Sequence, residues 1–129
     1  MDESKFDKRL IEAAIAAQSN AYCPYSEYKV GSAVVTPDGQ IFSGCNVANA
    51  SFGVTICAER IAIGSAVAAG CKEFHTVCVV TRDGGTPCGA CRQFIYQFGD
   101  AIRVLIINNS TQQQRTFSIS ELLPESFRF

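Results

Sequence analysis

Hydrophobic side chains near the N-terminus recur at the three- and four-residue spacing that places them on one face of a helix. The members of this stripe are Phe6, Leu10, Ile11, Ala14, Ile15 and Ala17, and they predict a helix over residues 4–19. Two apolar stretches follow, residues 30–35 and 40–45. They flank Pro37-Asp38-Gly39, a turn sequence, and therefore predict a β-hairpin.

The rest of the chain alternates between the same two kinds of pattern. After an irregular loop over residues 46–56, a helix is expected from Cys57 to Ala69, with Gly70 as its stop. Buried strands are predicted over residues 76–80 and 102–107, with a helix over 88–98 between them. A short strand over 115–117 and a capped helix start at residues 118–121 end the series. This order predicts one domain over 1–129, an α/β sandwich with a mixed sheet.

Composition restricts the function classes. Apolar residues make up 47% of the 129, and the net charge is -1. A chain without a basic excess is a poor candidate for nucleic-acid binding. No apolar run approaches a membrane span, and the first residues do not resemble a secretory signal. We therefore expect a cytoplasmic protein whose seven cysteines are reduced or bind metal. Asp100 and Arg103 are expected to be solvated charges.

Two thiols stand three positions apart in Pro87-Cys88-Gly89-Ala90-Cys91. At a helix N-terminus both sulfurs can face one point, as zinc ligation requires. The same spacing serves reversible dithiols, and two buried structural cysteines are a third interpretation. This motif alone therefore leaves its chemistry open.

A second motif, Cys57-Ala58-Glu59, also lies where a loop enters a predicted helix. Three cysteine ligands would leave the fourth zinc position open to water, which is the catalytic arrangement. A carboxylate two residues after a ligand can reach that water without binding the metal. Zinc base deaminases combine these elements, with a glutamate that transfers protons.

Several segments resemble the small homotetrameric cytidine deaminases. They are Cys57-Ala58-Glu59-Arg60, Pro87-Cys88-Gly89-Ala90-Cys91-Arg92, Tyr22-Cys23-Pro24-Tyr25-Ser26, Gly44-Cys45-Asn46-Val47, Leu122-Leu123-Pro124 and Phe127. The resemblance implies a three-layer α/β/α sandwich with a mixed five-stranded sheet and one Zn²⁺ per chain. It also implies a hydrolase of pyrimidine salvage that converts cytidine or 2′-deoxycytidine to the uridine product and ammonia. Blasticidin S deaminases are related.

Site residues follow from the same resemblance. Cys57, Cys88 and Cys91 would bind zinc, and Glu59 would transfer protons. Arg60 would donate hydrogen bonds to the thiolates and withdraw charge from them.

The remaining matched positions concern the nucleoside. Asn46 would bond the ribose, and an asparagine that satisfies its own turn is the alternative interpretation. Tyr28 would pack beside the nucleoside, and the backbone of Ala58 would meet the pyrimidine edge. Phe127 would stack on the base bound by a neighbouring subunit.

One position departs from the pattern. Ala48 stands where the family has a glutamate that accepts a hydrogen bond from the ribose. Its absence predicts weaker ribose recognition or a substrate with an altered sugar, as in the blasticidin S deaminases. Outside the deaminases, a dithiol redox protein would leave Cys57-Ala58-Glu59 unexplained. A structural zinc module would need a fourth protein ligand.

Overall fold

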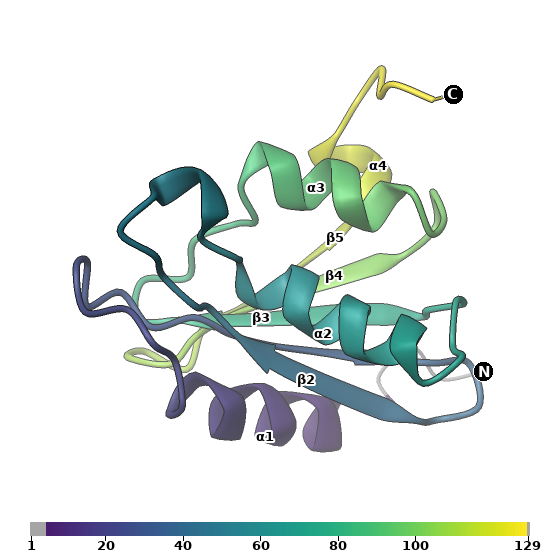
Figure 1. Cartoon of the computed structure of the whole chain (residues 1–129). Helices are drawn as coiled ribbons and strands as arrows, with labels where there is room; N and C mark the ends of the chain where they lie inside the picture. The colour runs from purple at the N-terminus through teal and green to yellow at the C-terminus, as the bar shows by residue number, and fades with distance from the viewer. Residues whose placement is uncertain (1–4, 129) are drawn as a thin grey trace.

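In the computed structural model, which describes residues 5–128, a five-stranded sheet separates two helical layers (Figure 1). The strands are β1 (Gly31–Val35), β2 (Ile41–Cys45), β3 (Thr76–Thr81), β4 (Arg103–Asn108) and β5 (Gln114–Ser118). The helices are α1 (Asp7–Gln18), α2 (Ala58–Ala68), α3 (Gly89–Tyr96) and α4 (Ile119–Leu122), with a 3₁₀ turn, η1, at Phe52–Val54. The predicted three-layer α/β/α sandwich is confirmed.

The strand order is β2-β1-β3-β4-β5. Strands β3 and β4 are parallel, and the other neighbouring pairs are antiparallel, so the sheet is mixed as predicted. A parallel pair needs a crossover connection, and α3 is that connection. The crossover brings the start of α3 to the same side of the sheet as α2 (Figure 1).

Both faces of the central strands are buried, because α1 covers one face and α2 and α3 cover the other (Figure 1). In β3, Val77 and Val79 join the core under α2 and α3, whereas Cys78 and Val80 join the core under α1. Successive side chains of a strand point to opposite faces. This explains why residues 76–80 and 102–107 are continuous apolar runs rather than alternating ones.

The predicted boundaries agree with the observed ones to within a few residues. The structure starts α1 at Asp7, and residues 1–4 lie outside the described part of the chain. The loop over 46–56 contains η1, which the sequence pattern did not predict. At α4 the predicted capping motif forms: Ser118 N donates to Glu121 Oε1, and Glu121 N donates to Ser118 Oγ.

The expectation that Arg103 is a solvated charge is wrong. Its guanidinium donates two hydrogen bonds to Asp7, at 2.8 and 2.9 Å, and the side chains of the two residues are only 16% and 17% exposed. The pair joins α1 to β4 across 96 residues of sequence. Asp100 is exposed as expected and pairs with Arg128 at 3.2 Å. Among the described residues, no helix has the length and apolar character needed to cross a membrane.

Candidate active site

The three cysteines of the two sequence motifs meet at one point. Their Sγ atoms all lie within 4.8 Å of one another, and the Cys57–Cys88 distance is 3.9 Å. Tetrahedral ligands about 2.3 Å from a zinc ion are separated by about 3.8 Å. The spacing and the thiol donor set therefore fit a zinc ion with three protein ligands.

Helix starts position these thiols. Cys57 is the N-cap of α2, Cys88 is the N-cap of α3, and Cys91 lies in the first turn of α3. The positive end of a helix dipole favours thiolates. Hydrogen bonding from Cys91, followed by smaller contributions from Cys88 and Arg60, lowers the pKa of Cys57 to about 5. Near neutral pH Cys57 is therefore a thiolate, which is the form that binds a metal cation.

Glu59 lies in the first turn of α2 and is 4% exposed. Burial, reinforced by the charge of Cys57, raises its pKa to about 7. An acid–base group is most effective when its pKa is near the working pH. Glu59 can thus both accept and donate a proton beside the thiols. The carboxylate is not needed to complete the three-thiol cluster.

Arg60 lies close enough to Cys57 to lower the pKa of that thiol. Its Nη2 donates to the carbonyl of Thr55 at 2.9 Å. Its Nε is buried and has no hydrogen-bond partner among the described residues. A buried donor without a partner is costly, and a thiolate is an acceptor available in this cluster. This geometry fits a residue that donates to the metal-binding sulfurs.

A pocket of about 250 Å³ opens above this cluster. Its lining contains six of the predicted residues, namely Tyr28, Asn46, Cys57, Ala58, Glu59 and Cys88, together with Val30, Thr55, Val79, Thr81, Gly85, Thr86 and Pro87. The pocket thus places a largely apolar wall opposite a few polar groups, as small-molecule sites do. A flat, uncharged ring fits this lining better than a phosphate does.

The Asn46 amide has a role that the sequence analysis missed. Its Nδ2 donates to the carbonyl of Tyr28 at 2.8 Å, and its Oδ1 accepts from Val30 N at 3.0 Å. Asn46 therefore fixes the segment that carries Tyr28 rather than satisfying its own turn. Nδ2 can still donate one further hydrogen bond, and Oδ1 can still accept one, on the side of the pocket that Asn46 lines.

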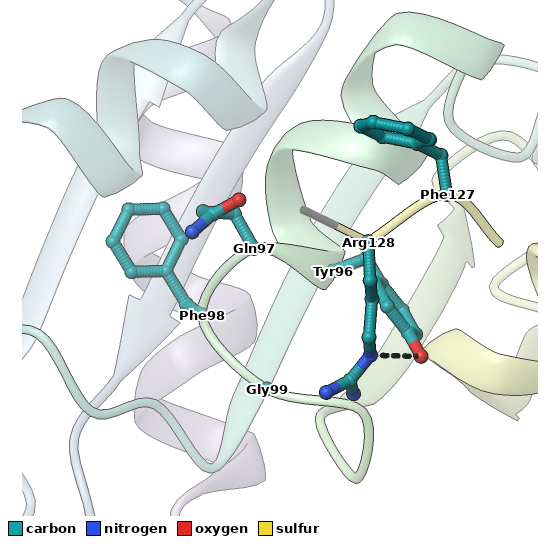
Figure 2. Close-up of a pocket in the computed structure, with 6 residues that line it drawn as sticks. All are labelled: Tyr96, Gln97, Phe98, Gly99, Phe127 and Arg128. Carbon is teal, nitrogen blue, oxygen red and sulfur yellow. Dashed lines mark hydrogen bonds between the residues drawn. The ribbon is translucent and has the colours of Figure 1, made fainter.

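Ala48, which departs from the family pattern, and the predicted substrate residue Phe127 both lie outside this pocket. Ala48 lines a neighbouring apolar hollow with Tyr25, Ser26, Phe52 and Thr55, of which Thr55 also lines the main pocket. Phe127 is 70% exposed and lines a separate hollow between the end of α3 and the C-terminal tail (Figure 2). Among the residues that the structure describes, the lining of that hollow includes none of the thiols and no carboxylate. Within one chain, Phe127 does not contribute to the main pocket.

A further supporting residue is Arg92, which directly follows the second thiol pair. Its guanidinium donates to the carbonyls of Pro87 and Leu122 and to the hydroxyl of Thr86, at 2.7–2.8 Å. These bonds hold the loop that ends at Cys88 against α4. The arginine beside the motif was visible in the sequence, but its bond to Leu122, 30 residues away, was not.

The fold and the three-thiol centre are those of a zinc-dependent hydrolase. Residues 4–107 match the family model described as the cytidine and deoxycytidylate deaminase zinc-binding region. The chain belongs to this family. Its membership agrees with the resemblance found in the sequence and with a zinc ion held by the cysteine cluster.

Several cytidine deaminases are similar to this protein along nearly the whole chain. A cytidine deaminase of Halalkalibacterium halodurans is 39% identical over 120 residues, covering 92% of this chain and 91% of that protein. A crystal structure of cytidine deaminase from Burkholderia pseudomallei superposes with a TM-score of 0.88 at 46% identity, covering 93% of this chain and 98% of that one. The Mycobacterium tuberculosis cytidine deaminase gives 0.81 at 33% identity, covering 95% and 97%.

Proposed function

We propose that this chain is a zinc-dependent cytidine deaminase, a hydrolase that converts cytidine or 2′-deoxycytidine and water to the uridine product and ammonia. One observation carries the proposal: three thiols at two helix starts converge beside the buried Glu59, at the base of a pocket sized for a small molecule. The same arrangement accounts for both sequence motifs at once. A dithiol redox protein would require only Cys88 and Cys91.

Cys57, Cys88 and Cys91 would hold the zinc ion, and Arg60 would donate to their sulfurs. Bound zinc makes water a competent nucleophile near neutral pH. Glu59 accepts a proton from the attacking water and donates it to ring N3. It then accepts the proton of the new C4 hydroxyl and delivers it to the amine, so that the C4–amine bond breaks as the C4 carbonyl forms and ammonia leaves.

The other pocket residues orient the nucleoside. The backbone of Ala58, at the first turn of α2, meets the edge of the pyrimidine, and the ring of Tyr28 packs beside the nucleoside. Asn46 uses its remaining hydrogen-bond capacity on the sugar. These contacts hold C4 of the ring near Glu59 and the thiols.

The sugar preference depends on Ala48. The hollow beside it is apolar and adjoins the main pocket through Thr55, so a ribose hydroxyl finds no carboxylate there. Deamination of cytidine, deoxycytidine, cytosine and blasticidin S, followed by ultraviolet absorbance, tests both function and preference. In Ala48→Glu the KM for cytidine should fall about tenfold, because a hydrogen bond to a charged group forms. An unchanged KM contradicts this role of position 48, and an inactive zinc-loaded parent contradicts the proposed function.

The active site is completed in a homotetramer, in which Phe127 stacks on the base bound by a neighbouring subunit. Support comes from the exposure of Phe127 and of five other large apolar side chains in two loops that contact each other through Tyr22–Val47 and Tyr25–Phe52, namely Tyr22, Tyr25, Val47, Phe52 and Val54. Contiguous exposed apolar surface is typical of interfaces.

A mixing experiment tests this arrangement. Phe127→Ala and Glu59→Gln should each be nearly inactive, and co-refolding them should restore part of the activity, because a mixed oligomer combines one intact Glu59 with one intact Phe127. Each variant refolded alone is the control. Mixed oligomers without activity would contradict sharing of Phe127.

The chain would act in the cytoplasm as a single domain in pyrimidine salvage. Its metal-binding thiols must stay reduced, and a reducing compartment keeps them so. All seven cysteines are free in the structure.

A further inference from the structure

The wall of the active-site pocket contains a hydrogen bond that joins two distant loops. The hydroxyl of Tyr28 donates to Asp83 Oδ1 at 2.5 Å, across 55 residues of sequence. Tyr28 lines the pocket, whereas Asp83 lies outside it in the loop between β3 and α3. That loop continues through Gly85, Thr86 and Pro87 of the pocket lining to Cys88.

Asp83 is itself held in place by its own loop. The same Oδ1 accepts from Gly85 N at 3.1 Å and from the hydroxyl of Thr81 at 3.2 Å. The Thr81 hydroxyl in turn accepts from the amides of Gly84 and Gly85, at 2.8 and 3.0 Å. The carboxylate is therefore a fixed point of the loop rather than a mobile surface charge.

Tyr28 is held from its other sides as well. Asn46 Nδ2 binds the Tyr28 carbonyl, and the guanidinium of Arg82 lies 5.1 Å from the ring centre. A Cβ atom placed on Gly85 would lie 3.2 Å from the Tyr28 hydroxyl. Glycine at this position therefore permits the close approach of the loop to the tyrosine.

The protonation states favour the bond. Partial burial and the Asp83 carboxylate raise the pKa of Tyr28, and the Tyr28 hydroxyl lowers the pKa of Asp83. At neutral pH a neutral phenol thus donates to an ionised carboxylate, and such charge-assisted bonds are stronger than neutral ones.

We infer that Asp83 is a positioning residue of the active site: through the Tyr28 hydroxyl it fixes the tyrosine ring and the loop at Gly85 at the separation that the nucleoside needs. The inference rests on the proposed function for its substrate. It assigns Asp83 no contact with the nucleoside and no part in proton transfer. Loss of the bond should weaken binding while the thiols and Glu59 keep their places.

Steady-state kinetics of zinc-loaded Tyr28→Phe, Asp83→Ala and the double variant with cytidine test this inference. Each single change should raise KM about three- to tenfold, with kcat within about twofold of the parent. The double variant should be no worse than the more affected single variant, because both remove the same bond. Asp83→Asn should stay near the parent, since its amide oxygen can accept from both Tyr28 and Gly85.

Asp38→Ala is the matched control. Asp38 is an exposed carboxylate in the turn between β1 and β2, where it accepts from Thr36 and Gln40. Its loss should leave KM unchanged. An effect of Tyr28→Phe without one of Asp83→Ala would mean that the hydroxyl binds substrate directly, and would overturn the inference. Additive effects, or a loss in kcat alone, would overturn it too.

Hydrogen exchange separates failure of this inference from failure of the proposed function, because it needs no substrate. In both Tyr28→Phe and Asp83→Ala the amides of Gly84 and Gly85 should exchange faster than in the parent and in Asp38→Ala. An inactive parent with this exchange pattern would contradict the proposed function and leave the positioning bond supported. Unchanged exchange in both variants would overturn the positioning role.

Discussion

Replacing Glu59 by glutamine removes the proton carrier and leaves the shape of the site almost unchanged. The side chain is 4% exposed, and burial raises its pKa to about 7. Acid–base groups contribute about 10²- to 10⁴-fold to a rate, which corresponds to about 2.7–5.4 kcal/mol in the barrier. We expect kcat for cytidine to fall at least about 100-fold.

The same substitution should not lower the stability of the fold, although it lowers kcat. The pKa of Glu59 is about 7 in the fold against an ordinary value of 4.5. A raised carboxyl pKa means that the folded protein binds more protons than the unfolded chain between these two values, so this residue's contribution to stability falls as pH rises from 4.5 to 7. At about 1.4 kcal/mol per pKa unit, the ionised carboxylate costs up to about 3 kcal/mol at pH 8. Glu59→Gln should therefore melt no lower than the parent at pH 8.

The assay combines the loss of cytosine absorbance, zinc content by mass spectrometry and a thermal melt at pH 8. Zinc content should equal that of the parent, because Glu59 lies outside the three-thiol cluster. Glu12→Gln, an exposed change on α1, is the control and should alter none of these measurements. Near-parental kcat would refute the proton-transfer role. Loss of zinc together with activity would show that Glu59 supports the metal site instead.

Two further substitutions test how the fold positions the site. Gly44→Ala places a Cβ atom 2.5 Å from Ala62 N and 2.7 Å from the Ala58 carbonyl. It should lower the free energy of unfolding, measured with denaturant, by about 1–3 kcal/mol and also lower kcat. Gly64→Ala is the control, because a Cβ atom at Gly64 meets open space. Equal stability of the two variants would contradict tight packing of α2 on β2. Asp7→Ala removes both bonds to Arg103 and should destabilise by about 1–2 kcal/mol, against almost nothing for the exposed Asp100→Ala. Similar values for the two would contradict a structural role of that ion pair.

The sequence alone determined the order of the elements and the chemistry of the centre. Strands β3 and β4 are readable because a strand covered on both faces must be apolar at every position. The two cysteine motifs are readable because each occupies one helix start, where spacing along the chain fixes spacing in space. Local geometry of this kind is a property of a few consecutive residues.

Tertiary structure decided which of these local features meet. Cys57 and Cys88 converge because the β3-α3-β4 crossover brings α3 beside α2, and sequence spacing does not fix that distance. Asp7 bonds to Arg103, 96 residues away, and Tyr28 bonds to Asn46 and to Asp83, 18 and 55 residues away. Polar side chains of this kind look like ordinary surface or turn residues in a sequence. Their partners are set by strand order and loop packing, which emerge only when the whole chain is folded.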